Sequence, residues 1–206
     1  MKVYIVDYGM GNLMSVKRAF EECEADEVCI CNNPEELFNA DRIVLPGVGS
    51  FYEGMNNLNS KGWTRIIKQI AKERQIPILG ICLGMQLFAS KGYEGKEIEG
   101  LNLIDGEVKK LIPSNGNERI PHIGWNEIYK FNDSGLFLGI DDGTDFYFVH
   151  SYHFIPKNES DIMTKTLYCG EFVSSISNGK IYGVQFHPEK SHKSGFMIIK
   201  NFLSIN

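Results

Sequence analysis

The sequence of 206 residues is long enough for one well-buried domain, and its 43% apolar and 23% charged residues are typical of soluble globular proteins. A net charge of −5 argues against general binding to nucleic acid, which requires clustered Lys and Arg. The opening apolar run meets Asp7 at once, unlike a secretory signal, and no apolar stretch reaches the roughly 20 residues that cross a bilayer. Five cysteines without an export signal predict reduced thiols in a cytoplasmic protein.

Strand and helix signals alternate through the first half of the chain. Strands of a parallel sheet that is covered on both faces read as continuous apolar runs, whereas a helix repeats its apolar residues every three or four positions. These patterns predict strands at 2–7, 27–31, 42–45 and 76–81, and helices at 13–23, 34–40 and 63–74. The alternation implies right-handed crossovers and a mostly parallel sheet, whose sites lie at the carboxyl ends of its strands.

The signals change near Leu103. Short β-like runs separated by Gly, Asn, Asp and Pro follow, and helical spacing returns only at 195–203. The short runs are 107–112, 127–131, 146–154 and 181–186. No linker divides the chain, so we expect one α/β domain over residues 1–206, with a mostly parallel central sheet flanked by helices and a smaller antiparallel portion.

Gly80-Ile81-Cys82-Leu83-Gly84 has the form of a nucleophile elbow, in which a strained residue between a strand and a helix carries the reactive side chain. A predicted strand precedes the motif, and a helix-capable segment, 83–90, follows it. The amino terminus of that helix would help to stabilise a thiolate. The alternative is a buried structural cysteine, because free cysteines often pack as small hydrophobic residues.

Gln185-Phe186-His187-Pro188-Glu189 favours the reactive interpretation of Cys82. Side chains two positions apart on an extended segment point the same way, so Glu189 can orient an imidazole at His187. A nucleophile, a base and an orienting carboxylate are therefore all available. Their order along the chain proves nothing, because such triads are defined by geometry.

Other clusters of reactive residue types predict neither a metal site nor a cofactor. The remaining histidines have no recognisable zinc-ligand spacing, and those at 150 and 153 lie in an aromatic run where a structural role is expected. The cysteines at 23, 29 and 31 contain no Cys-x-x-Cys pair. Gly9-Met10-Gly11-Asn12 does not complete a phosphate-binding or dinucleotide-binding fingerprint, and it predicts a turn at the carboxyl edge of the sheet.

Three motifs, in order along the chain, resemble those of the class I, or triad, glutamine amidotransferases. They are Leu45-Pro46-Gly47-Val48-Gly49, Gly80-Ile81-Cys82-Leu83-Gly84-Met85-Gln86 and Gly183-Val184-Gln185-Phe186-His187-Pro188-Glu189. Further segments are similar to the glutaminase subunits of imidazole glycerol phosphate synthases: 7–12, 121–126, 148–152 and 190–191. The resemblance covers nearly the whole chain and implies a flavodoxin-like fold.

The resemblance also implies a reaction. Cys82 would attack the side-chain amide of glutamine, His187 would carry the proton to the departing ammonia, and Glu189 would hold His187. Backbone N–H groups would stabilise the negative charge that develops on the amide oxygen. The oxyanion and substrate contacts that the resemblance assigns are Gly47, Val48, Gly49, Leu83, Gln86, Glu94, Ser151 and Tyr152.

The resemblance further implies a partner, because ammonia that escapes into water is protonated and loses its nucleophilicity. We expect a heterodimer with a (β/α)8 barrel synthase subunit, with Asn12, Trp125 and Lys190 near the interface. Glycines on both sides of Val48 would permit a peptide flip, so that the oxyanion site forms only when the partner holds its substrate. No cofactor is implied.

Other functions remain open at this stage. His153 and His192-Lys193 depart from the commonest histidine-pathway pattern and are similar to paralogous subunits that serve surface-sugar amidation, so the acceptor is not determined. A stand-alone γ-glutamyl hydrolase could use a similar Cys and His pair. A binding subunit without catalysis would be expected to show a broken triad, whereas Cys82, His187 and Glu189 are all present.

Overall fold

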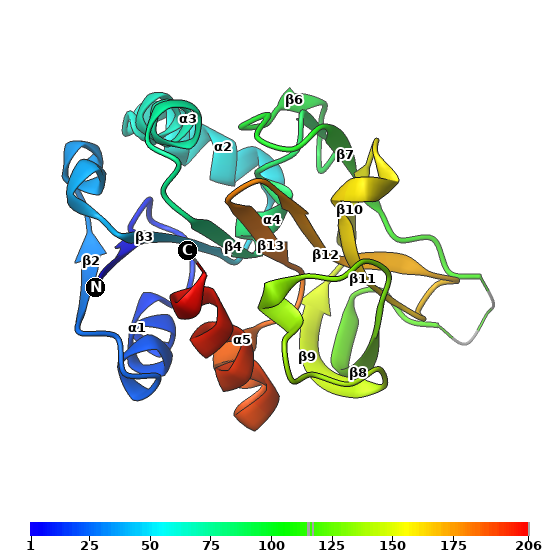
Figure 1. Ribbon diagram of the computed structural model, residues 1–206. Helices are drawn as coiled ribbons and strands as arrows, with labels where there is room; N and C mark the ends of the chain where they lie inside the picture. The colour runs from blue at the N-terminus through cyan, green and yellow to red at the C-terminus, as the bar shows by residue number, and fades with distance from the viewer. Residues whose placement is uncertain (115, 117, 206) are drawn as a thin grey trace.

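The computed structural model describes residues 1–114, 116 and 118–205, and its central feature is one large sheet with helices on both faces (Figure 1). The strands of this sheet lie in the order β2-β1-β3-β4-β13-β12-β11-β8-β9. Their bounds are β1 Lys2–Val6, β2 Glu27–Cys31, β3 Arg42–Gly47, β4 Ile78–Cys82, β8 His122–Lys130, β9 Thr144–His150, β11 Ile162–Thr166, β12 Phe172–Asn178 and β13 Ile181–Val184.

The sheet has a parallel half and an antiparallel half. The strands from β2 to β13 pair in parallel, and those from β13 to β9 pair in antiparallel fashion. The α/β architecture agrees with the sequence prediction, but the antiparallel portion is larger than expected because the sequence signals do not indicate β11 and β12. In the parallel half, Gly47 lies opposite Cys82, so the carboxyl ends of β3 and β4 meet at one edge.

Two helices cover each face of the parallel half. Figure 1 shows α1 and α5 on one side of the sheet, and α2 and α3 on the other. Successive residues of β3 enter separate cores, because side chains alternate across a strand: Val44 belongs to the core beneath α1 and α5, whereas Ile43 and Leu45 belong to the core beneath α2 and α3. The bounds are α1 Leu13–Glu22, α2 Phe51–Ser60, α3 Trp63–Glu73 and α5 His192–Ser204.

Helix α2 has no counterpart among the elements predicted from the sequence. Its start is fixed by Ser50, whose Oγ accepts a hydrogen bond from the N–H of Glu53 (3.3 Å) and donates to the Glu53 carboxylate (3.0 Å). A Ser followed three residues later by a Glu is a helix-start signal, so this pair could have indicated the helix. Asn12 caps α1 in a similar way, accepting from the N–H of Ser15 (3.2 Å).

A smaller sheet lies beside the large one, with strand order β10-β7-β5-β6. The prediction of one strand over 146–154 is wrong, because β9 ends at His150 in the large sheet and β10 starts at Tyr152 in the small one. The Ser151 carbonyl between them accepts from the N–H of Leu111 (2.9 Å), which holds the crossing point. The bounds are β5 Lys91–Gly92, β6 Ile98–Glu99, β7 Gly106–Lys110 and β10 Tyr152–Pro156.

The remaining helices are short. They are α4 Leu83–Gln86 and the 3-10 turns η1 Pro34–Asn39, η2 Gly135–Phe137, η3 Glu159–Asp161 and η4 Pro188–Lys190. Over the described residues, none of the helices is both long and apolar enough to cross a bilayer.

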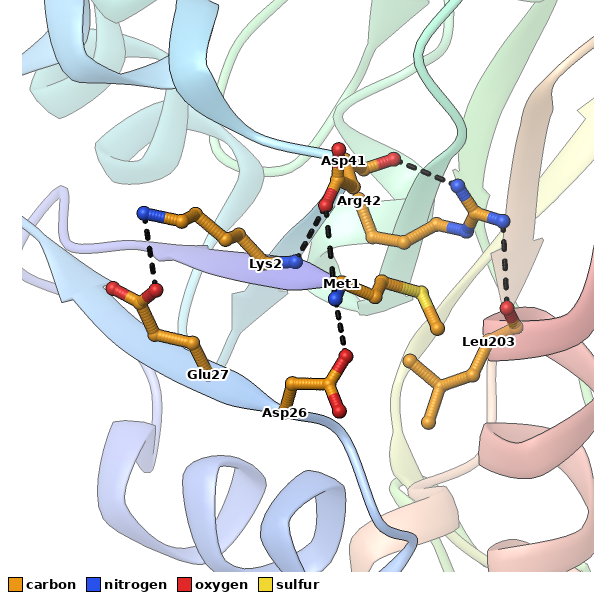
Figure 2. Close-up of polar contacts among 7 residues, drawn as sticks. All are labelled: Met1, Lys2, Asp26, Glu27, Asp41, Arg42 and Leu203. Carbon is orange, nitrogen blue, oxygen red and sulfur yellow. Dashed lines mark hydrogen bonds and ion pairs between the residues drawn. The ribbon is translucent and has the colours of Figure 1, made fainter.

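The amino ends of the parallel strands form a polar corner, which Figure 2 shows. Arg42 donates to the carbonyls of Asp41 (2.8 Å) and Leu203 (3.3 Å), and so joins the start of β3 to the end of α5. The N–H of Lys2 donates to the Asp41 carboxylate (2.7 Å). This corner also contains the ion pairs Met1–Asp26 and Lys2–Glu27. It lies at the end of the parallel strands opposite to Cys82.

Candidate active site

Cys82 occupies a sharp turn between β4 and the single helical turn α4. Its φ is 54° and ψ is −109°, a strained conformation for a residue with a side chain, and it is only 5% exposed. The flanking glycines are required sterically. A Cβ on Gly84 would lie 1.7 Å from the carbonyl oxygen of Leu45, and a Cβ on Gly80 would lie 2.7 Å from the backbone of Gly84. The predicted elbow is therefore present.

The helix after the elbow is shorter than expected. A helix does begin at Leu83, as the helix-capable segment over 83–90 predicts, but α4 ends at Gln86 and the chain then turns to pack against the loop at 100–104. A single turn has few aligned peptide dipoles, so any help to a Cys82 thiolate comes from the nearest N–H groups and neighbouring side chains.

His187 and Glu189 form a buried pair beside the elbow. Nδ1 of His187 lies 2.8 Å from Oε1 of Glu189, and the two side chains are 5% and 2% exposed. Burial lowers the pKa of His187, but the charge of Cys82 and the contact with Glu189 outweigh it and raise that pKa to about 10. Within the residues that the structure describes, Nε2 of His187 has no hydrogen-bond partner. Cys82 nevertheless raises the pKa of His187 through its charge and a side-chain contact, which indicates that the sulfur lies beside the imidazole.

A narrow cavity of about 50 Å³ opens on Cys82. Its walls come from the loop after β3, the elbow, Glu94 and the crossing between β9 and β10. Gly47 does not line it, but pairs with Cys82 across β3 and β4. Seven of the eight residues predicted for oxyanion and substrate contacts line it: Val48, Gly49, Leu83, Gln86, Glu94, Ser151 and Tyr152.

Glu94 closes one side of this cavity. Its Oε2 accepts from the N–H of Phe51 at the start of α2 (2.7 Å), and burial raises its pKa. The loop before α2 carries Val48, which is 42% exposed, and Gly49, whose φ of +121° favours glycine. The carboxylate is thus anchored to the helix that follows this loop.

Two residues at the site were not assigned a role from the sequence, although both lie in segments that carry the resemblance. Gln185 donates from Nε2 to Sγ of Cys82 (3.6 Å). The hydroxyl of Tyr8 is fully buried and has no hydrogen-bond partner among the described residues, and a Cβ on Gly47 would lie 2.3 Å from it. Burial and the charge of Cys82 raise the pKa of Tyr8 far above its ordinary value.

The residues predicted at a partner interface lie on three elements, β8, η4 and the start of α1. Trp125 is 46% exposed and stacks on His192, with ring centroids 5.1 Å apart. Lys190 approaches the ring of Tyr147 (5.8 Å), which also contacts Trp125 (6.0 Å). Asn12 instead lies at the start of α1, which packs against η4.

The other histidines contact protein groups. His122 and His150 are joined by a bond of 3.0 Å between Nδ1 and Nε2, and His153 packs against Phe172. In the part of the chain that the structure describes, no three His, Cys, Asp or Glu side chains are grouped as metal ligands would be. The cysteines at 23, 29 and 31 are free thiols.

Comparisons with known proteins indicate the family and the fold. The family described as Glutamine amidotransferase class-I matches residues 4–205. The imidazole glycerol phosphate synthase subunit HisH of Moorella thermoacetica is 46% identical over 97% of this chain and 93% of its own, and subunit HisH 1 of Campylobacter jejuni is 45% identical over 98% and 100%. The solved structure of PurLQS from Thermotoga maritima shares the fold with a TM-score of 0.73, at 17% identity over 98% of this chain and 97% of that one.

The family match spans almost the whole chain, and the two relatives align over nearly their full lengths. Cys82, the buried pair of His187 and Glu189, and the cavity beside them lie within the matched residues. The chain therefore belongs to the class I glutamine amidotransferases.

Proposed function

We propose that this chain is the glutaminase subunit of an imidazole glycerol phosphate synthase, and that residues 1–206 act as one amidotransferase domain. The observation that carries the proposal is the placement of Cys82, on a strained elbow that lines the cavity, beside the buried pair of His187 and Glu189. Relatives that are 43–46% identical over nearly the whole chain are named as subunits of that synthase.

In this mechanism the thiolate of Cys82 attacks the side-chain amide carbon of glutamine. The tetrahedral intermediate collapses to a glutamyl thioester when His187 gives its proton to the departing nitrogen, which leaves as ammonia. Water, deprotonated by His187, then attacks the thioester and releases glutamate and the thiolate. The raised pKa of His187 supports a protonated imidazole that can give its proton to the departing nitrogen.

The oxyanion of the intermediate would be held by the N–H of Leu83 and by an N–H of the Gly47-Val48-Gly49 segment. These residues lie beside Cys82. Because the cavity is narrow, we infer that the Gly47-Val48-Gly49 segment rearranges before glutamine is fully held. A peptide flip beside Val48 would complete the oxyanion site.

The amino acid end of the substrate would lie among Gln86, Glu94 and the backbone of Ser151 and Tyr152. Both N–H groups of Gln86 are used within the protein, to the carbonyl of Tyr152 (2.8 Å) and to Gln185 (2.9 Å). Gln86 would therefore meet the α-ammonium group through Oε1, an acceptor, and the carboxylate of Glu94 would add charge complementarity.

The partner would be a (β/α)8 barrel subunit that receives the ammonia and aminates the acceptor. Trp125 and Lys190 support an interface over β8, β9 and η4, because an exposed tryptophan is typical of protein contacts and both residues approach the ring of Tyr147. A cytoplasmic location is supported by the five cysteines, all of which are free thiols.

The proposal is tested by trapping the thioester. The purified chain is mixed with labelled glutamine and the barrel subunit, quenched in acid within the first turnover, and analysed by mass spectrometry. A glutamyl adduct on the peptide that contains Cys82, absent from the Cys82→Ala variant, is expected. An adduct on another residue, or turnover that persists in Cys82→Ala, would contradict the proposal.

A further inference from the structure

The side-chain amide of Gln185 is held against the sulfur of Cys82. Nε2 of Gln185 lies 3.6 Å from Sγ and donates to it, and Gln185 is 0% exposed. An amide has a donor end and an acceptor end, so its effect on a sulfur anion depends on which end faces the sulfur. That orientation is determined by groups farther from Cys82.

The backbone carbonyl of Tyr152 fixes the orientation of two glutamines, because a carbonyl can only accept. Gln86 must turn its NH2 group toward this oxygen, at 2.8 Å. The second N–H of the same group lies 2.9 Å from Gln185, which must therefore present Oε1. The NH2 group of Gln185 is then left facing Cys82.

The same carbonyl fixes two histidine tautomers. Nδ1 of His150 lies 2.8 Å from the oxygen of Tyr152, so the proton of His150 must be on Nδ1. Nε2 of His150 is then an acceptor, and Nδ1 of His122 donates to it (3.0 Å). Nε2 of His122 is left to accept from the amide of Asn126 (3.4 Å).

These hydrogen bonds form one network that runs from Asn126 to Cys82, and the donor directions assigned at its Asn126 end agree with those assigned from the Tyr152 carbonyl. Oδ1 of Asn126 accepts from the N–H of Glu127 (2.8 Å), which fixes that amide with its NH2 group toward His122. Both imidazoles must be neutral, and burial lowers the pKa of His150 to about 3 and that of His122 to about 4. The hydrogen bonds thus follow one consistent pattern from β8 to the sulfur.

We propose that Gln185 is a positioning residue that stabilises the thiolate of Cys82 through its N–H, and that the network anchored on the Tyr152 carbonyl prevents the amide from turning over. A turned amide would place Oε1 against the sulfur and oppose the anion. The inference rests on the proposed role of Cys82 as the nucleophile. If Gln185 only fills the core, its replacement changes stability but leaves the thiol unchanged.

Other polar groups also lie near Cys82. The imidazole of His187, which Glu189 contacts, and the hydroxyl of Tyr8 interact with Cys82, and His150 lines the same cavity. Glu94 lines the same cavity. The test therefore changes Gln185 alone and leaves these groups in place.

The test measures the rate at which iodoacetamide alkylates Cys82 between about pH 5 and pH 10, in the free chain without glutamine or partner. Alkylation is followed by mass spectrometry of the peptide that contains Cys82. Burial raises the pKa of Cys23 and of Cys31 to about 11, so these thiols react slowly near neutral pH.

Gln185→Glu replaces the donor with oxygen at nearly constant shape, and Gln185→Met removes both polar ends. Each variant is expected to raise the pKa of the Cys82 thiol by about one unit and to lower alkylation near neutral pH about tenfold. Gln69→Glu, on the exposed face of α3, is the control and should match wild type. Urea unfolding confirms that each variant is folded.

An unchanged pKa of Cys82 in both folded variants would overturn the inference. A raised pKa supports it even if the chain with its partner produced no glutamate, because alkylation needs neither. In that case the proposed function would fail while the role of Gln185 remained.

Discussion

His187 and Glu189 are joined by a bond of 2.8 Å between Nδ1 and Oε1, although both side chains are almost wholly buried. A buried carboxylate is costly unless it is paired, so this contact holds the imidazole in one orientation and favours its charged form. The opposite ring nitrogen, which has no hydrogen-bond partner in the part of the chain that the structure describes, is left for the chemistry at Cys82.

Replacing Glu189 with Gln should preserve the shape of the pair but remove the charge. The pKa of His187 then falls, the thiolate loses its counter-ion, and kcat for glutamine hydrolysis is expected to fall about a hundredfold. Glu73→Gln, on the surface of α3, is the matched control. A kcat for Glu189→Gln equal to that of the control would contradict the role of Glu189.

The buried histidines should make the protein sensitive to acid. His150 and His122 have pKa values lowered by burial to about 3 and about 4, whereas in the unfolded chain they titrate near about 6.5. Their stabilising effect is complete above the unfolded pKa, and is lost as pH falls from about 6.5 toward those values, because the unfolded chain binds the protons first.

Urea midpoints measured across this range provide the check. In His150→Gln, the decline of the midpoint with falling pH should be shallower than in wild type. His192→Gln, a change at a ring that stacks on Trp125, should retain the wild-type slope. Equal slopes in all three proteins would contradict the assignment of neutral, buried histidines.

Gly84→Ala should disrupt the elbow, because the added methyl group would lie 1.7 Å from the Leu45 carbonyl oxygen. The backbone must shift, and the expected loss in the free energy of unfolding is about 1–3 kcal/mol, together with most of the glutaminase activity. Gly135→Ala adds its methyl group where nothing lies within 4 Å and should change stability by about 0.5 kcal/mol or less. Similar losses in the two variants would argue against the steric account.

Tyr8→Phe removes a buried hydroxyl that has no hydrogen-bond partner over residues 1–114, 116 and 118–205. The free energy of unfolding should stay the same or rise by about 1 kcal/mol, because an unsatisfied polar group is removed from the core. Tyr168→Phe is the contrasting variant, since the Tyr168 hydroxyl donates to the carbonyl of Arg119 at 2.6 Å, and it should lose about 1 kcal/mol. Thermal or urea unfolding distinguishes the two, and a clear loss in Tyr8→Phe would indicate an unseen partner.

The parallel half of the fold could be predicted from the sequence because its signals are local, and the same holds for the elbow at Cys82 and the pairing of His187 with Glu189. The strand that ends at Cys82 is continuously apolar, and the glycines beside it are needed for the turn. Strands β11 and β12 give a weak apolar signal because some of their buried residues are polar. Thr164 bonds to Ser174 (2.9 Å) and Ser175 (2.6 Å), so the polar atoms satisfy one another within the core.

The orientation of the site amides could not be predicted from the sequence. Gln86 and Gln185 are 99 positions apart, and their donor directions follow from the carbonyl of Tyr152 on a third segment. The split between β9 and β10 has a similar cause, because an aromatic run such as 146–154 does not show that the chain changes sheets at Ser151.

The most direct test of the central claim is glutamate production from glutamine by the purified chain alone, with the barrel subunit and its imidazole-pathway ligand, and with Cys82→Ala in place of wild type. We expect a low rate alone, a large increase with partner and ligand, and no activity above background in the variant. Activity that persists in Cys82→Ala would contradict the mechanism. No response to that partner, with a response to a surface-sugar synthase subunit instead, would contradict the proposed pathway.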